Sequence, residues 1–179
     1  MPQSLKKLRS NRAWIERHIN DAFVKKSRRE GYRARSVYKL TELDDTEHLF
    51  RPGMNVADLG SAPGSWTQIV RERLTDKNGE LKGRIIAMDI LPMEPIDGVT
   101  FLQGDFREQE VADKLNEILG GDKLDVVISD MAPNLSGIAM VDANASLLLN
   151  ELALDFAVEH LKPEGRHCLQ ILPLQFKPG

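Results

Sequence analysis

The chain has 179 residues, of which 41% are hydrophobic and 28% are charged, as expected for one globular domain with a core of its own. No run approaches the roughly 18 apolar residues of a membrane span, and the N-terminus lacks the apolar core of a secretory signal. The only cysteine, Cys168, excludes an internal disulfide, and we expect a cytoplasmic protein without a membrane partner.

The net charge of −3 hides an asymmetry along the chain. Residues 1–40 hold 12 Lys or Arg against three acids, a local net charge of +9, so residues 41–179 carry −12. Clustered cations bind phosphates by releasing counterions, which predicts an RNA-like partner for this segment. A solvated helix face is the alternative. A mitochondrial presequence is a second one, because the segment is basic and poor in acids.

The first elements are one or two helices at about 12–30 and a further helix at about 33–45, before Arg51-Pro52-Gly53. Aromatic residues interleave with the cations. They would stack on unpaired bases or dock the segment on the rest of the protein: Trp14, Phe23, Tyr32 and Tyr38. We therefore predict a basic helical RNA-binding arm over residues 1–49.

A strand at about 54–59 follows, and the next helix begins at about 64. The connection reads Asp58-Leu59-Gly60-Ser61-Ala62-Pro63-Gly64, a strand-to-helix turn whose glycines let a ligand approach the backbone and the helix N-terminus. Its Gly-x-x-x-Gly spacing differs from the Gly-x-Gly-x-x-Gly of dinucleotide enzymes, which disfavours an NAD-dependent oxidoreductase. The loop suits a ligand without phosphates, such as S-adenosylmethionine. A plain turn without a ligand is the alternative.

Three further apolar runs end near an aspartate, as the first run ends near Asp58. They close on Asp89, Asp105 and Asp130. Parallel sheets bind ligands outside the carboxyl ends of their strands, so the four acids are expected at one crevice. A carboxylate after the second strand can accept both hydroxyls of a ribose, and one after the third can accept from an adenine amino group. A single acid here is more often a cap or turn residue.

The remaining elements complete an alternating pattern. We expect a loop at 91–95, a helix at about 107–120, a strand from 124, a loop at 131–137, a helix at about 142–161 and a fifth strand near 166. Alternating strands and helices predict an α/β fold, a Rossmann-like, mostly parallel sheet with helices on both faces, over residues 50–179.

Four segments carry a family resemblance: Arg33-Ala34-Arg35-Ser36-Val37-Tyr38-Lys39-Leu40, the Asp58 to Trp66 loop, Gln103-Gly104-Asp105-Phe106, and Ser129-Asp130-Met131-Ala132-Pro133-Asn134-Leu135-Ser136-Gly137. Together they resemble the FtsJ/RlmE family of S-adenosylmethionine-dependent methyltransferases, which modify ribose 2′-hydroxyls of large-subunit ribosomal RNA. The resemblance runs from about Asn11 to Gly165 and includes Trp14, which indicates that the N-terminus is the family's own arm and not a presequence.

The resemblance implies the 2′-O-methylation of a ribose, that of a uridine, in 23S rRNA or a ribosomal particle, by a monomer with S-adenosylmethionine as cofactor and no metal. It implies catalytic roles for Lys39 and Asp130, and cofactor contacts at five positions: Gly64, Trp66, Asp89, Asp105 and Asp130. These residue types suit the chemistry. A lysine beside the weakly acidic hydroxyl stabilises developing negative charge, and a carboxylate keeps the lysine oriented and protonated.

The chain departs from the family pattern near its end. Gln170 stands where the family's fifth strand carries a second catalytic lysine, the proposed base. The chain then stops before the family's last two strands and distal glutamate, so we expect a C-terminally incomplete domain, through truncation or a frameshift that sequencing of the locus would reveal. Because Gln170 has no basic nitrogen, the alternative function is a catalytically impaired protein that binds RNA or cofactor.

Overall fold

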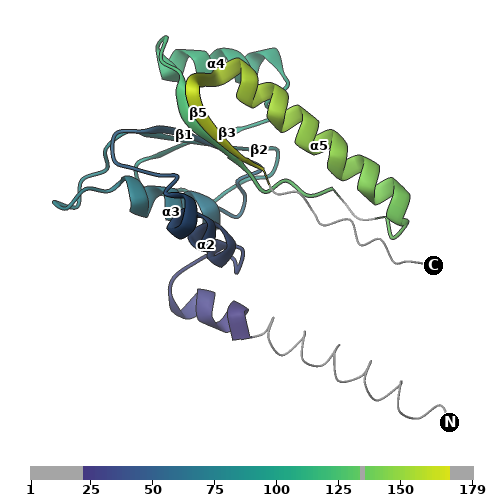
Figure 1. Ribbon diagram of the computed structural model, residues 1–179, viewed down its shortest axis with the longest axis horizontal. Helices are drawn as coiled ribbons and strands as arrows, with labels where there is room; N and C mark the ends of the chain where they lie inside the picture. The colour runs from purple at the N-terminus through teal and green to yellow at the C-terminus, as the bar shows by residue number, and fades with distance from the viewer. Residues whose placement is uncertain (1–21, 134–135, 170–179) are drawn as a thin grey trace.

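The computed structural model describes residues 22–133 and 136–169 (Figure 1). A helix at 22–29 comes first. The other elements, in chain order, are α2 (Val37–Glu47), β1 (Asn55–Leu59), α3 (Ser65–Leu74), β2 (Arg84–Asp89), β3 (Val99–Gln103), α4 (Gln109–Leu119), β4 (Leu124–Ser129), α5 (Ala139–His160) and β5 (Leu161–Leu169).

The five strands form one sheet in the order β3-β2-β1-β4-β5, and every neighbouring pair is parallel. The chain runs outward from β1 to β3 and then returns to the other side of β1 as β4. The order of the strands therefore reverses between β1 and β4, where open α/β sheets bind their ligands. The predicted α/β fold with a parallel sheet is confirmed.

Helices cover both faces of the sheet, with α2 and α3 on one face and α4 and α5 on the other (Figure 1). The alternation of side chains along β1 supplies both cores, because successive residues of a strand point to opposite faces. Val56 packs with α2 and α3, whereas Ala57 and Leu59 pack with α4 and α5. The three central strands β2, β1 and β4 are buried on both sides, which explains why they are nearly continuous apolar runs.

The end of the described chain differs from the expectation. The strand predicted near 166 begins at Leu161, which pairs with Leu124, and regular pairing resumes only where Arg166 meets Val126. Residues 162–165, with the sequence Lys-Pro-Glu-Gly, lie between these two pairs and form an irregularity inside β5. They therefore belong to the strand, which was expected to begin only after them. Gln170, which stands at the position of the family's second catalytic lysine, lies outside the described residues, as do residues 1–21 of the predicted arm, Trp14 included.

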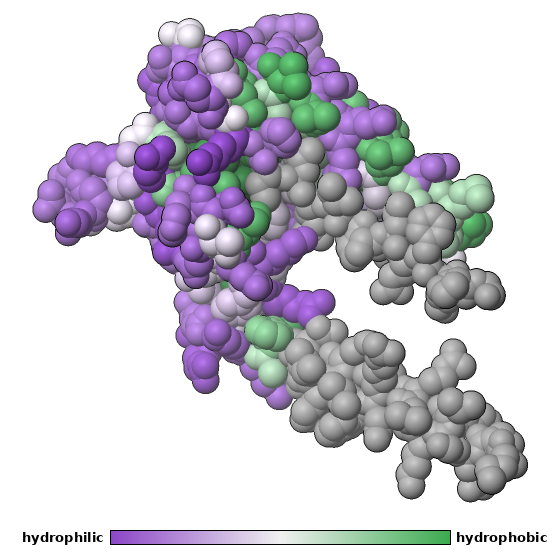
Figure 2. Space-filling model, in the orientation of Figure 1, coloured by the Kyte–Doolittle hydropathy of each residue, from purple (hydrophilic) through white to green (hydrophobic). Residues whose placement is uncertain are grey.

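The surface is mainly hydrophilic, with hydrophobic side chains gathered along α5 (Figure 2). Met140 and Val158 of this helix are each 76% exposed, and Leu147 and Leu148 are more than half exposed. Among the helices that the structure describes, none is both long and apolar enough to cross a membrane.

Candidate functional site

A cavity of about 470 Å³ opens at the carboxyl ends of the strands, beside the reversal of strand order. It falls within the size range of small-molecule sites, about 300–1,000 Å³. Three of the predicted site acids, Asp89, Asp105 and Asp130, line it together. The rest of the wall is mostly apolar: Gly60, Ala62, Met88, Ile90, Leu91, Gly104, Phe106, Arg107, Met131, Ala132, Pro133, Leu149 and Leu152.

The glycine loop brings the backbone close to this cavity. Gly60 has a φ of +71°, and a Cβ at this position would lie 2.4 Å from Cγ of Met131. A side chain here would therefore clash as well as strain the backbone, so glycine is required. The carboxylate of Asp89 holds the loop in place, because it accepts hydrogen bonds from the amides of Ala62 and Leu91, both at 2.8 Å.

Asp105 follows β3 and forms an ion pair with Arg107, which also lines the cavity. Nε of Arg107 donates to Oδ1 at 2.8 Å and to Oδ2 at 3.0 Å, and its backbone amide donates to Oδ1 at 2.9 Å. This hydrogen bonding by Arg107 lowers the pKa of Asp105, which keeps the carboxylate ionised. Arg107 thus keeps Asp105 able to accept hydrogen bonds. It also competes with any ligand for the carboxylate oxygens of Asp105.

Asp130 follows β4 and is partly buried. Burial raises the pKa of its carboxyl, and the positive charge of Lys39 acts in the opposite direction. Lys39 lies on α2 with its side chain exposed, and it is not a cavity-lining residue. The structure therefore brings the two predicted catalytic residues within electrostatic reach of each other, although only Asp130 belongs to the cavity wall.

Two predicted cofactor residues lie at the start of α3 and outside the cavity wall. Gly64 caps α3 with a φ of +106°, and the space that a Cβ would take there is occupied by the guanidinium of Arg33. Trp66 is only 3% exposed, packs in the core under α2, and donates its indole N–H to the carbonyl of Ser36 at 2.9 Å. In this structure the indole of Trp66 therefore joins α3 to the segment before α2, and its role in cofactor binding stays a prediction.

Asp58, the fourth acid expected at the crevice, does not line the cavity, so the expectation that four acids converge there is correct for only three of them. Its side chain is buried within β1 and accepts a hydrogen bond from Thr67 at 2.6 Å, whereas Oδ1 has no partner. Burial raises the pKa of Asp58 to about 7, against the hydrogen bond from Thr67, and the charges of Asp130 and Asp89 raise it further. Near neutral pH this buried carboxyl is therefore poised between its protonated and ionised forms.

The described part of the basic segment is a helix at 22–29 whose cations Lys25, Lys26, Arg28 and Arg29 are exposed. The neighbouring aromatic rings contact one another. Phe23 and Tyr32 lie 5.6 and 6.4 Å from Tyr38 between ring centroids, and Nζ of Lys26 lies 4.4 Å from the centroid of that ring. Tyr32 also donates to Glu72 of α3. Tyr32 and Tyr38 thus pack the basic helix on the body, which favours the docking alternative for these two rings.

A family model described as FtsJ-like methyltransferase matches residues 32–175. The chain belongs to this family. It is 55% identical over 168 residues to "Ribosomal RNA large subunit methyltransferase E" of Paracidovorax citrulli, an alignment that covers 92% of this chain and 77% of that protein. The protein of the same name from Variovorax paradoxus is 56% identical over 168 residues, with 92% and 76% covered.

A crystal structure of a ribosomal RNA methyltransferase from Plasmodium falciparum has the same fold. It superposes with a TM-score of 0.70 at 34% identity, and the match covers 77% of each chain. Family membership is thus supported by sequence and by structure, and the resemblance inferred from the four motifs is confirmed.

Sequence patterns alone did not reveal three features of this FtsJ-like chain: Arg107, the apolar wall contributed by α5, and the contact between Arg33 and the glycine loop. Arg107 had one signal, its position two residues after a predicted site acid. Leu149 and Leu152 had none, because which face of α5 meets the cavity depends on how the helix packs. Within residues 22–133 and 136–169, no three His, Cys, Asp or Glu side chains gather as metal ligands would.

Proposed function

We propose that this FtsJ-like methyltransferase transfers the methyl group of S-adenosylmethionine to a ribose 2′-hydroxyl of large-subunit ribosomal RNA, with a uridine as the expected target. The observation that carries the proposal is the convergence of Asp89, Asp105 and Asp130 on one cavity, with Lys39 within electrostatic reach of Asp130. The names of the close relatives, which are ribosomal RNA large subunit methyltransferases, support the substrate.

The volume of the cavity, about 470 Å³, and the chemistry of its lining suit the cofactor. Its apolar side chains, among them Phe106, Leu149 and Leu152, suit a flat adenine ring, and its carboxylates suit the polar edges of adenosine. Asp89 would accept from the ribose hydroxyls and Asp105 from the adenine amino group. Gly60 lines the cavity without a side chain, so the cofactor would lie against its backbone there. When bound, S-adenosylmethionine would supply an electrophilic methyl group on a sulfonium.

The residues of the chain would act on the ribose hydroxyl. Lys39 would lie beside the attacking oxygen, where its ammonium lowers the pKa of the hydroxyl and stabilises negative charge as it develops. Asp130 would keep that ammonium charged and oriented. Holding the two reactants in line would supply much of the acceleration. Gln170, at the position of the family's proposed base, has no nitrogen that could take the proton, so we expect slow turnover.

The RNA would be held by the basic segment. Helix 22–29, which carries the exposed cations, lies on the same side of the sheet as α2 and α3 (Figure 1). Lys39 belongs to α2. Residues 1–49 would therefore act as the RNA-binding arm, with phosphates on the cations. One chain would supply the cofactor cavity, Lys39 and the arm, so we propose a monomer that acts on rRNA in the cytoplasm.

The test is methyl transfer from radiolabelled S-adenosylmethionine to large ribosomal subunits from a strain that lacks this modification, with the labelled nucleotide mapped. Transfer to one ribose 2′-oxygen is expected. Lys39→Met should lower its rate by about 10²–10³-fold, whereas Lys77→Met, which removes an exposed lysine from the loop after α3, should leave it unchanged. Cofactor binding without transfer by the unchanged chain would favour a binding function instead, and absence of both would overturn the proposal.

A further inference from the structure

Arg33 lies outside the cavity, yet its guanidinium contacts both loops that form one cavity wall. Nη1 donates to the carbonyl of Pro63 in the glycine loop at 3.0 Å and to the carbonyl of Glu94 at 2.6 Å. Nη2 donates to the carbonyl of Pro95 at 2.9 Å. The loop that contains Glu94 and Pro95 follows β2 and also contains Leu91, which lines the cavity. One side chain therefore bridges two loops by charge-assisted hydrogen bonds, which are stronger than neutral ones.

The same two loops are bridged a second time at the cavity by Asp89. Its carboxylate accepts from the amide of Ala62 in the glycine loop and from the amide of Leu91 in the loop after β2. Arg33 satisfies carbonyls and Asp89 satisfies amides, so the two side chains complement each other. The missing side chain of Gly64 leaves room for this arrangement, because a Cβ there would lie 2.9 Å from Nη1 of Arg33.

The backbone around Arg33 is fixed to α3. The amide of Arg33 donates to Oε1 of Gln68, and Nε2 of the same Gln68 donates to the carbonyl of Gly31, both at 3.0 Å. The hydroxyls of Ser36 and Ser65 lie 2.9 Å apart. Segment 31–36 is therefore held to the first turn of α3 on both sides of Arg33, and α2 with Lys39 begins directly after it.

We propose that Arg33 is a positioning residue for the cofactor site. It holds the glycine loop and the loop after β2 at the separation that the cofactor needs, and it fixes both relative to the segment that carries Lys39. The inference rests on the proposed function, because it takes the cavity to be the cofactor site. A lysine at position 33 lacks the planar fork that reaches two loops at once, so it would replace only part of the contact.

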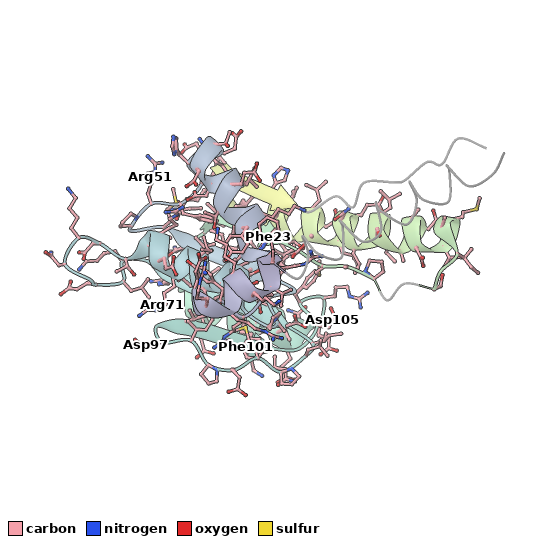
Figure 3. The ribbon with its side chains drawn as sticks, turned by 90° about the horizontal axis from the view of Figure 1, so that it is seen from below. Phe23, Arg51, Arg71, Asp97, Phe101 and Asp105 are labelled. Carbon is pink, nitrogen blue, oxygen red and sulfur yellow. The ribbon has the colours of Figure 1, made fainter. Side chains whose placement is uncertain are left out.

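The experiment measures the binding of S-adenosylhomocysteine by calorimetry to the unchanged chain and to Arg33→Gln, Arg33→Lys and Arg71→Gln. Arg71 is the matched control. Its Nε donates to the carbonyl of Asp97 in the same loop after β2 at 2.6 Å, but it makes no described contact with the glycine loop (Figure 3). We expect Arg33→Gln to raise the Kd about tenfold or more, Arg33→Lys to raise it less, and Arg71→Gln to change it by less than about twofold.

Two further measurements separate positioning from general stability. Millimolar guanidinium chloride, compared with sodium chloride at the same ionic strength, should restore part of the affinity of Arg33→Ala. Amide hydrogen exchange without ligand should quicken at residues 60–65 and 90–96 in Arg33→Gln, but in Arg71→Gln the glycine loop should stay protected.

An unchanged Kd in Arg33→Gln, or equal losses in Arg33→Gln and Arg71→Gln, would overturn the assignment while leaving the proposed function intact. If the unchanged chain does not bind S-adenosylhomocysteine, the proposed function fails, and the inference about its cofactor site fails with it. The ligand-free exchange experiment distinguishes that case, because it reports on the bridge between the two loops alone.

Discussion

The cavity and the basic helix at 22–29 present opposite kinds of charge. In the cavity, Asp89 and Asp105 are partly buried, and each accepts at least two hydrogen bonds. Asp89 is the last residue of β2, and Asp105 lies two residues after β3. On the helix, cations such as Arg28 and Arg29 are exposed to solvent. The carboxylates of the cavity offer hydrogen-bond acceptors in fixed positions for a small ligand. The exposed cations of the helix instead produce a positive electrostatic potential that attracts a polyanion without fixed geometry. Mutations in the two regions should therefore change different measurements.

The largest effect should come from Lys39, which stands between the two regions. Lys39→Met should lower the methyl-transfer rate by about 10²–10³-fold, the usual result of removing a group that stabilises developing charge. The Kd for S-adenosylhomocysteine should stay nearly constant, because Lys39 is not a cavity-lining residue. Single-turnover transfer assays with calorimetry check both values. If the affinity for S-adenosylhomocysteine fell by the same factor as the methyl-transfer rate, Lys39 would contribute to cofactor binding, and the prediction would be wrong.

The next effect concerns pH and the buried Asp58. Its pKa in the folded protein is about 7, above the 3.8 expected for an unfolded aspartate, so the folded state holds the proton more tightly. This group therefore contributes stability below pH 4 that is lost as pH rises towards 7, at up to about 1.4 kcal/mol per pH unit. Asp58→Asn should flatten the slope over that window.

Denaturant unfolding of both proteins from pH 4 to 8 tests this. The difference in free energy of unfolding between Asp58→Asn and the unchanged chain should grow in favour of the variant as pH rises. A constant difference across the series would mean that Asp58 is ionised throughout. Thr67→Val should raise the pKa of Asp58 further, since it removes the hydrogen bond that favours the carboxylate.

A third prediction concerns Asp105, which we propose accepts from the adenine amino group. Asp105→Ala should weaken the binding of S-adenosylmethionine by about 1–3 kcal/mol, the cost of leaving buried donors without partners. The reduction in affinity should be nearly the same at low and high salt, because the carboxylate acts over a short distance in a partly enclosed site. Calorimetry at two salt concentrations checks it, and an unchanged Kd would remove Asp105 from the site.

The smallest effect per residue is expected on the basic helix. Replacing Lys25, Lys26, Arg28 and Arg29 by glutamine should weaken RNA binding and flatten its salt dependence, with a log–log slope smaller by about 0.7–0.9 for each phosphate that is no longer neutralised. Cofactor affinity should not change. Filter binding over a salt series measures the slope, and an identical slope would mean that these cations form only a solvated surface.

Strands β1 to β4 were predictable because each is a short, mostly apolar run that ends near an acid or a glycine, whereas the polar start of β5 was missed. The strand from Arg84 to Asp89 is placed as expected, and the first strand begins within a residue of its predicted start. Helix ends were harder. The helix expected at 33–45 begins at Val37, and the amide of Arg33 before it donates to the side chain of Gln68 of α3.

The acids of the site were predictable from topology alone. In a parallel sheet the residue after each strand reaches the same edge, so Asp89, Asp105 and Asp130 had to lie near one another. The positions of Arg33 and Trp66 were not predictable in this way. Both depend on how the segment before α2 packs against α3, an association of residues about 30 positions apart that no local pattern encodes.

The central position of β1 suggests an order of assembly during synthesis. Val56 pairs with Ile85, 29 positions later, but also with Val126, 70 positions later. Near contacts close smaller loops and form sooner, so β1, α3, β2 and β3 can associate while β4 is still being made. The Asp89 contact to the glycine loop would then form early, whereas Asp130 and the wall residues of α5, Leu149 and Leu152, would be added later. A ribosome stalled after the segment up to residue 110 has emerged should therefore present a partly folded, cofactor-incompetent half, detectable by protection of β1 and β2 from proteolysis.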